Sequence, residues 1–316
     1  MKPVGISVII PIFNEEGNIQ KLYNEINEVL PDKDSYEIVF VDDGSKDESF
    51  NLLKRIASKD KKVKIVKLMS NYGQSNAISA GITNCAGNII VTMDSDMQHD
   101  PKDILPLIKK INEGYHVVCG WRKNRNSSDS LIRKTIPSKL ANILVRIITG
   151  SKLNDSTGGM RAFTRRVVEN IHLYGEMHRY LPLLALWKGF RVTEVPINIR
   201  KRANGKTNYN YTRIFRGFLD LLTIKFFMKY STRPFHIFGF LGIVSFLSGF
   251  LINFFFAYEK IFFGRHLYQD LPSIILGVVL ILLGIMFLGF GFIADMISYD
   301  AISSQKRETY LIDEIV

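Results

Sequence analysis

The chain has 316 residues, of which 47% are hydrophobic, and its formal net charge is +11. This length allows one large domain, or one domain with an appendage. The positive charge is compatible with nucleic acid, an anionic membrane surface or a phosphorylated substrate as a partner. Cys85 and Cys119 are the only cysteines. Their spacing excludes a cysteine-ligated metal site, and both are predicted to be reduced core residues.

Short β-branched runs alternate with helical patterns in the first part of the chain. Strands are predicted at 6–13, 36–45, 63–69 and 87–94, and helices at 15–30, 46–60 and 74–85. This alternation predicts an α/β fold with a mostly parallel sheet and helices on both faces. Sheets of this kind bind ligands at the carboxyl ends of their strands.

Polar residues gather at the carboxyl ends of the four predicted strands. They are Asn14 and Glu15, following Pro11; Asp42 and Asp43; Asn71 and Gln74; and Asp94, Asp96 and Gln98. Each group alone is also explained as a helix cap or a turn. Four such groups at one edge of a sheet favour a ligand site.

The spacing of Asp94, Asp96 and Gln98 is typical of a site for a hard cation. Two carboxylates and an amide suit a divalent ion that keeps some water and shares its other positions with phosphate oxygens. Mg²⁺ or Mn²⁺ is therefore predicted, and a metal-bound diphosphate is a good leaving group because its developing charge is neutralised. The chain has no GxGxxG after the first strand and no GxxxxGK[ST], which argues against dinucleotide-binding and P-loop domains.

Residues 235–258 and 271–294 contain no charged residue. As a helix each would be about 36 Å long, enough to cross a hydrocarbon layer of about 30 Å. They are predicted to be transmembrane helices, and the alternative is a pair of buried core helices. With two spans, a membrane and a phosphorylated substrate are favoured as partners over nucleic acid. Lipid-facing surface on the spans is compatible with a homo-oligomer.

The charges that flank the spans predict their orientation. The opening sequence MKPVGISVIIPIFNEE has no signal-peptide pattern, so the first 230 residues are expected to stay on the side of synthesis. Basic residues lie before the first span and after the second: Lys225, Lys229, Arg233, Lys306 and Arg307. By the positive-inside rule, both chain ends are predicted to be cytoplasmic, in a multi-pass protein of the cell membrane.

Two further segments, 131–149 and 211–230, combine basic residues with regularly spaced apolar ones. Such amphipathic helices tend to lie in the membrane interface, and the alternative is two core helices with solvated basic faces. The predicted organisation is a cytoplasmic α/β domain at 1–208, a juxtamembrane helix at 209–233, a transmembrane hairpin at 234–296 and a cytoplasmic tail at 297–316.

Three motifs, in this order and spacing, resemble the GT-A fold of the inverting family-2 glycosyltransferases over residues 4–205. They are Pro11-Ile-Phe-Asn14-Glu15, Val41-Asp42-Asp43-Gly44-Ser45 and Asp94-Ser95-Asp96. Other stretches narrow the resemblance to polyprenyl-phosphate glycosyltransferases: MQHDP after the second aspartate, GWR at 120–122, DSTGGMRAF at 155–163, GEMHRYLP at 175–182 and RANGKTNY at 202–209.

The resemblance implies roles for particular residues. The nucleotide-sugar site would comprise Pro11, Asn14, Glu15, Asp42, Asp43, Asn71, Gln74, Asp94 and Gln98. Asp94, Asp96 and Gln98 would hold the metal and the diphosphate, which makes Asp96 catalytic. The acceptor phosphate would be bound by Arg122, Arg133, Ser138, Arg200, Arg202 and Lys206.

The acceptor chemistry favours a lipid phosphate on independent grounds. A lipid monophosphate, with a second pKa near 6, is already mostly dianionic and needs cations more than a base. The segment Glu176-Met177-His178-Arg179 also lacks the adjacent Glu-Asp pair that hydroxyl-directed relatives often show. Asp155 is the remaining candidate for a catalytic or orienting carboxylate. Its alternative role is to cap the turn before the sequence GGMR.

The predicted function is inverting transfer of one sugar from a nucleotide diphosphate sugar to a polyprenyl monophosphate at the cytoplasmic membrane face. UDP-glucose and undecaprenyl phosphate are the favoured pair because of the resemblance to bactoprenol enzymes. A processive polysaccharide synthase is an alternative, but there is no QxxRW motif and no span before the α/β domain. A non-catalytic membrane scaffold is the other alternative, and the acids at every predicted strand end argue against it.

Overall fold

The computed structural model describes residues 4–30, 36–123, 153–155, 158–171, 180–200, 226, 234–264, 266–303 and 312–315. The chain divides into two compact units. The first comprises Met1–Ile224 and Glu308–Val316, and the second Lys225–Arg307. The predicted interfacial helix at 131–149 lies outside the described residues, and so does the one at 211–230 except for Phe226.

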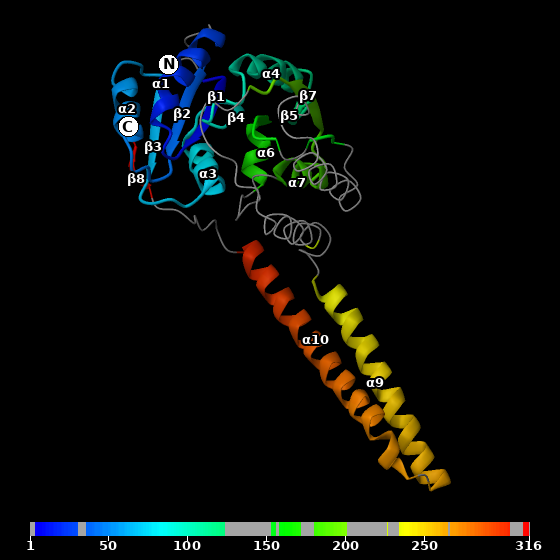
Figure 1. Ribbon diagram of the computed structural model, residues 1–316. Helices are drawn as coiled ribbons and strands as arrows, with labels where there is room; N and C mark the ends of the chain where they lie inside the picture. Colours follow the sequence, from blue (N-terminus) through cyan, green and yellow to red (C-terminus); the bar gives the residue numbers. More distant parts are fainter. Residues whose placement is uncertain are drawn as a thin grey trace. The chain divides into compact units, whose positions relative to one another are not determined.

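The first unit is built on one sheet, drawn with its covering helices in Figure 1. Its order is β7-β5-β6-β4-β1-β2-β3-β8. The strands are β1 (Ile6–Ile12), β2 (Tyr36–Asp42), β3 (Val63–Leu68), β4 (Ile89–Thr92), β5 (Val117–Arg122), β6 (Arg161–Thr164), β7 (Val192–Ile197) and β8 (Ile312–Ile315). Strands β1 to β4 are mutually parallel, and β5 is parallel to β7. β6 and β8 run antiparallel to their neighbours. The mostly parallel sheet confirms the predicted fold class.

Helices cover both faces of this sheet because the strands are apolar on both sides. The helices are α1 (Glu16–Val29), α2 (Ser49–Ala57), α3 (Gln74–Asn84), the short 3₁₀ turn η1 (Pro101–Asp103), α4 (Ile104–Asn112), α6 (Arg165–Asn170) and α7 (Leu181–Trp187). Val8 and Ile10 of β1 join the core formed with α1, α2 and α4. Ile9 points to the other face, where α3 lies so close that a Cβ on Gly81 would collide with it.

The register of the parallel strands brings their carboxyl ends to one edge. Ile12 of β1 pairs with Asp42 of β2, and Asp42 pairs in turn with Lys67 of β3. On the other side of β1, Ile9 pairs with Thr92, the last residue of β4. The loops that follow these four strands therefore leave the sheet at the same edge. The candidate site is built from those loops.

The second unit is a helical hairpin made of α9 (Phe235–Phe263) and α10 (Leu271–Ser303), joined by the 3₁₀ turn η4 (Leu267–Asp270). Both helices are long and apolar enough to cross a membrane. In the most apolar 18-residue stretch of each helix, only 11% (α9) and 17% (α10) of the stretch is buried. This argues against the alternative of buried core helices. Each helix extends beyond the predicted apolar run, because the charged residues that end the run do not break a helix.

Glycines let the two helices of the hairpin touch through their backbones. A Cβ on Gly242 would lie 2.9 Å from the carbonyl oxygen of Gly284, and one on Gly284 would lie 2.7 Å from that of Gly242. Small residues at a crossing give close van der Waals contact between helices in lipid. At the end of the hairpin near the first residue of α9, the Asp295 carboxylate accepts a hydrogen bond of 3.3 Å from the Phe235 amide.

Two regular elements lie in the described part of the predicted tail at 297–316. Helix α10 continues to Ser303, and β8 adds an antiparallel edge strand to β3 in the first unit. Lys54 of α2 donates to both carboxylate oxygens of Glu314, at 3.0 and 2.9 Å. The chain that follows the hairpin therefore returns to the sheet.

Candidate active site

A cavity of about 330 Å³ opens at the carboxyl ends of β1 to β4. Its lining residues are Pro11, Ile12, Phe13, Glu15, Asp43, Asn71, Gly73, Gln74, Asp94, Ser95 and Asp96. The structure thus brings together most of the residues predicted for the nucleotide-sugar site. Asn14, Asp42 and Gln98 are not among the lining residues.

The two acids at the end of β2 hold the surrounding backbone. Asp43 accepts hydrogen bonds from the amides of Tyr72 and Gly73, at 2.7 and 2.9 Å, and so holds the loop after β3. Asp42 is fully buried and accepts one from the Ser45 amide at 3.2 Å. Burial raises the pKa of both carboxyls, although these hydrogen bonds act in the opposite direction.

Asn14 links the loop after β1 to the turn after β2, so the helix-cap explanation does not hold for it. Its backbone is left-handed, with φ 55°. Its side-chain oxygen accepts from the Lys46 amide at 2.8 Å, and its own amide donates to Ser45 Oγ at 3.0 Å. The residue at the N-cap of α1 is Glu15, which makes no side-chain capping hydrogen bond.

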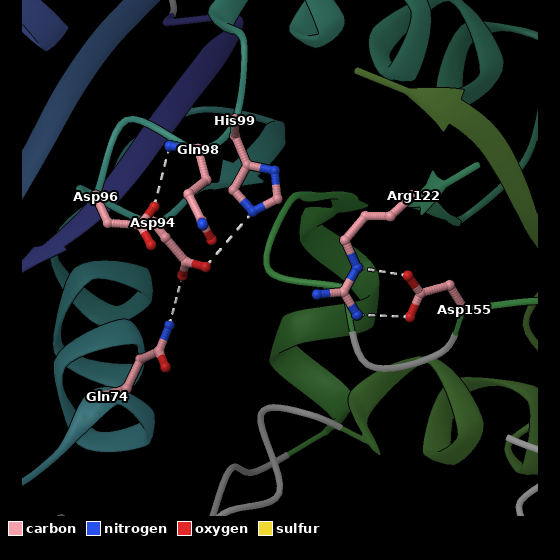
Figure 2. Close-up of polar contacts among 7 residues, drawn as sticks. All are labelled: Gln74, Asp94, Asp96, Gln98, His99, Arg122 and Asp155. Atoms are coloured by element: carbon pink, nitrogen blue, oxygen red, sulfur yellow. Dashed lines mark hydrogen bonds and ion pairs between the residues drawn. The ribbon is translucent and has the colours of Figure 1, made fainter. Parts of the chain in front are cut away.

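The carboxyl end of β4 carries the predicted metal-binding residues. Figure 2 shows the polar groups of Asp94, Asp96 and Gln98 gathered around one space. Gln74 Nε2 donates to Asp94 Oδ1 at 2.7 Å, and His99 Nε2 lies 3.5 Å from Asp94 Oδ2. The backbone amide of Gln98 donates to Asp96 Oδ1 at 3.1 Å, and this hydrogen bond closes the turn that holds the two aspartates together.

The environment of Asp94 keeps its carboxylate charged. Burial alone would raise its pKa, but hydrogen bonding and charge from His99, the charge of Arg161 and hydrogen bonding from Gln74 outweigh burial. The pKa of Asp94 is therefore lowered from its ordinary value. A charged carboxylate is the form that a cation binds.

The donor set fits a hard divalent cation that is only partly held by protein. Two carboxylates and an amide are the oxygen ligands that Mg²⁺ and Mn²⁺ take, together with water and phosphate oxygens. Within the described ranges, no group of three or more His, Cys, Asp or Glu side chains could hold a metal ion. A cation bound by Asp94, Asp96 and Gln98 would therefore need oxygens from a ligand. This agrees with the predicted sharing with a diphosphate.

Arg122, at the end of β5, forms a two-point ion pair with Asp155. Arg122 Nε lies 2.6 Å from Asp155 Oδ2, and Nη2 lies 2.9 Å from Oδ1. Burial alone would lower the pKa of Arg122, but its pairing with Asp155 outweighs this, so the pKa is raised. Figure 2 shows the pair across from the aspartates, with the remaining guanidinium nitrogen pointing to the side of Asp94. Asp155 therefore lies where it can orient Arg122.

Arg200, also predicted to bind the acceptor phosphate, is paired with two carboxylates. Its Nη1 lies 2.6 Å from Glu25 Oε2, and its Nη2 lies 2.9 Å from Asp100 Oδ2. Its backbone amide donates to the carbonyl of Gln98 at 2.9 Å. The other predicted phosphate-binding residues, Arg133, Ser138, Arg202 and Lys206, lie outside the described residues.

Four residues around the aspartates were missed by the sequence reasoning. Besides His99, Arg161 of β6 is buried and acts electrostatically on Asp94. A Cβ on Gly159 would lie 2.7 Å from Asp94 Cγ, so the Gly159 backbone lies too close to the carboxylate to leave room for a side chain. Glu194 of β7 holds the backbone beside Asp155. Three of them lie in or beside the quoted motifs MQHDP and DSTGGMRAF, but no local pattern reveals which side chains meet.

The mostly parallel sheet, with two aspartates and a cavity at the ends of its first four strands, is the arrangement expected of a GT-A glycosyltransferase. The family model described as Glycosyl transferase family 2 matches residues 7–172. The chain belongs to this family, which confirms the resemblance seen in the motifs.

Curated relatives match along the whole chain. Dodecaprenyl-phosphate galacturonate synthase of Rhizobium johnstonii is 33% identical, over 100% of this chain and 94% of the relative. Undecaprenyl-phosphate 4-deoxy-4-formamido-L-arabinose transferase of Pseudomonas syringae is 32% identical, over 100% of this chain and 93% of the relative.

Solved structures share the fold over part of the chain. Glucosyl-3-phosphoglycerate synthase of Mycobacterium tuberculosis, in complex with Mn²⁺, UDP and glucosyl-3-phosphoglycerate, aligns with a TM-score of 0.53 and 18% identity. The alignment covers 70% of this chain and 80% of that one. At this identity the likeness supports the fold alone.

Proposed function

We propose that the protein transfers one sugar from a nucleotide diphosphate sugar to a polyprenyl monophosphate, with inversion at the anomeric carbon. The observation that carries the proposal is the pairing of two half-sites in the first unit. Asp94 and Asp96 line the cavity of about 330 Å³, and the cation of Arg122 lies across from them. The same chain carries a hairpin long and apolar enough to span a membrane. Relatives that match its whole length are named for polyprenyl-phosphate chemistry.

The donor occupies the cavity in this proposal. The nucleoside lies over the loops held by Asp43, and the diphosphate lies against Asp94, Asp96 and Gln98. These three residues would hold Mg²⁺ or Mn²⁺, which would neutralise the charge that develops on the leaving diphosphate. The mycobacterial synthase that shares the fold was solved with UDP and Mn²⁺, and we propose that this chain binds groups of the same kind. UDP-glucose is our first candidate, and the names of the relatives add nucleotide-activated galacturonate and 4-deoxy-4-formamido-L-arabinose.

The acceptor phosphate approaches from the side of Arg122. An oxygen of its dianion attacks the anomeric carbon while the bond from that carbon to the diphosphate oxygen breaks. No proton has to be removed, because the dianion is already a nucleophile. Asp155 orients Arg122 and does not act as a base, since both of its oxygens accept from that guanidinium. The contributions of Arg133, Ser138, Arg200, Arg202 and Lys206 belong to this proposal as predicted from the motifs.

In this proposal the hairpin anchors the enzyme in the cell membrane. By the positive-inside rule, the basic residues that flank it in the sequence support a cytoplasmic first unit and cytoplasmic chain ends. The amphipathic segments at 131–149 and 211–230 would lie at the lipid surface. Anchoring supplies the local concentration of lipid acceptor that an insoluble substrate requires. A homo-oligomer formed through the lipid-facing surface is compatible with this arrangement.

The test is sugar transfer by membranes that contain the full chain. A panel of radiolabelled nucleotide sugars, led by UDP-glucose, is supplied with Mg²⁺ or Mn²⁺ and with either undecaprenyl phosphate or undecaprenol. Label is expected in the lipid extract only with the phosphate. Asp96→Asn should abolish transfer because it removes a ligand charge but little volume. The matched control is Asp60→Asn, which changes an acid three residues before β3, at the opposite edge of the sheet.

Transfer of label to undecaprenol, which has no phosphate, would contradict the proposal and indicate that the acceptor is a hydroxyl group. Label retained in a polymer would support a processive polysaccharide synthase. Near-normal transfer by Asp96→Asn would contradict the metal assignment. No transfer from any donor by the wild-type chain would support a scaffold.

A further inference from the structure

We propose that Glu194 is a positioning residue that sets the place of Arg122 relative to Asp94, and thereby controls use of the acceptor phosphate. The inference rests on the function proposed above. It assigns a role to a carboxylate that the reaction itself does not use.

Both oxygens of the Glu194 carboxylate hold one short piece of chain. Oε1 accepts from the Asp155 amide at 2.7 Å, and Oε2 accepts from the Asn154 amide at 2.8 Å and from Asn154 Nδ2 at 2.9 Å. Hydrogen bonds to a charged acceptor are stronger than neutral ones. Three of them on one carboxylate therefore fix the backbone at this point.

The residue held in this way is the partner of Arg122. The Asp155 side chain is 7% exposed, and its carboxylate accepts two hydrogen bonds from Arg122. Glu194 thus fixes the backbone of Asp155, and Asp155 fixes the guanidinium. The strands support the same geometry, because β7, which carries Glu194, pairs directly with β5, which ends at Arg122.

The chain that leaves Asp155 leads to the metal half of the site. The amide of Gly120 donates to the Met160 carbonyl at 3.0 Å, and the preceding residue, Gly159, lies close to the Asp94 carboxylate. Strand β6 begins directly after Met160 and is held between β4 and β5. The end near Asp94 is therefore fixed by the sheet. The end near Arg122 is held by Glu194.

This asymmetry separates a positioning role from a general structural one. Loss of Glu194 should move Arg122 and leave Asp94 in place, so acceptor use should change while donor and metal use do not. If Glu194 acts through Asp155, its removal should also have little further effect once the Asp155 carboxylate is gone.

The first experiment is Glu194→Gln in the full chain, assayed in membranes with the donor that the wild type uses. Glutamine keeps the length but replaces one acceptor oxygen by an NH2 donor, which would face one of the two backbone amides and leave it without its acceptor. We expect kcat/KM for undecaprenyl phosphate to fall about tenfold or more, with the KM of the nucleotide sugar and the metal requirement unchanged. Glu113→Gln is the matched control. Glu113 follows the last residue of α4 and contacts Lys110 on the surface, so this variant should behave as wild type.

The second experiment is a double-mutant cycle with Asp155→Asn. The double variant should be no slower with the acceptor than Asp155→Asn alone. If Glu194→Gln does not accumulate as folded protein, Asn154→Ala takes its place, because it removes one of the three hydrogen bonds. For this variant we expect a smaller fall in kcat/KM for undecaprenyl phosphate, again with the KM of the nucleotide sugar unchanged.

The outcomes separate this inference from the proposed function. Unchanged acceptor kinetics, an equal loss for donor and acceptor, or additive losses in the cycle would each overturn the role of Glu194 while wild-type transfer to undecaprenyl phosphate stands. A wild-type chain that does not use this phosphate would overturn the proposed function itself.

Discussion

Replacing Gly159 by alanine should impair catalysis by displacing Asp94, a proposed metal ligand. An alanine Cβ would overlap Asp94 Oδ2 and lie 2.7 Å from Asp94 Cγ, whereas ordinary contacts begin at 3.4 Å. The distance to Cγ alone requires a movement of about 0.7 Å by the carboxylate, the glycine backbone or both, and the closer Oδ2 requires more. Neighbouring backbone limits the glycine, because Met160 is hydrogen-bonded to Gly120. Most of the movement should fall on Asp94.

The expected size of the effect follows from this displacement. A shift of about 0.7 Å or more would strain the 2.7 Å hydrogen bond from Gln74 to Asp94 and misplace one proposed ligand of the cation. Misplacement by roughly 1 Å can cost about 100-fold in rate. We expect turnover to fall about 10- to 100-fold and half-saturation by Mn²⁺ to rise. The free energy of unfolding should fall by about 1–3 kcal/mol, as for other overpacked sites.

The assay is transfer of labelled sugar to lipid over a range of Mn²⁺ concentrations, with thermal unfolding measured on the same preparations. Gly289→Ala is the control, because a Cβ on this glycine of α10 meets nothing within 4 Å. Wild-type turnover and metal dependence in folded Gly159→Ala would refute the argument that this glycine is needed for contact with Asp94. A loss of activity matched by the control would point to a general defect.

Two further predictions concern stability. Burial raises the pKa of Asp42, so the folded state holds its proton more tightly, and the free energy of unfolding falls as pH rises from about 3.9 through the raised pKa. Asp42→Asn should therefore raise the melting temperature more at pH 7 than at pH 4, and an equal change at both would contradict this. Removal of residues 312–316 should expose the edge of β3, so amide exchange by mass spectrometry should speed up in Val63–Leu68 but not in Ile6–Ile12. Unchanged exchange in β3 would argue against a stable β8.

Local patterns in the sequence were enough to predict the layered α/β fold and the two apolar helices. Strand and helix periodicity depends on neighbouring residues, so the first four strands could be placed at 6–13, 36–45, 63–69 and 87–94, close to their positions in the structure. Because parallel strands end at one edge, the grouping of Asp43, Gln74 and Asp94 also followed from the order of the elements. The apolar runs predicted the hairpin, but charged residues at its ends did not stop the helices.

Only the tertiary structure decided which polar groups meet. Asp155 stood in the sequence as a candidate base or turn cap, and the fold places it on Arg122, 33 positions away. Glu194 contacts Asp155 across 39 positions, and Gly159 reaches Asp94 from another motif. The return of β8 to β3 joins Glu314 to Lys54 across 260 positions. Sequence periodicity reports which face of an element is buried, because that depends on nearby residues. It carries no information on the partner across a sheet or a loop, which depends on how distant segments pack.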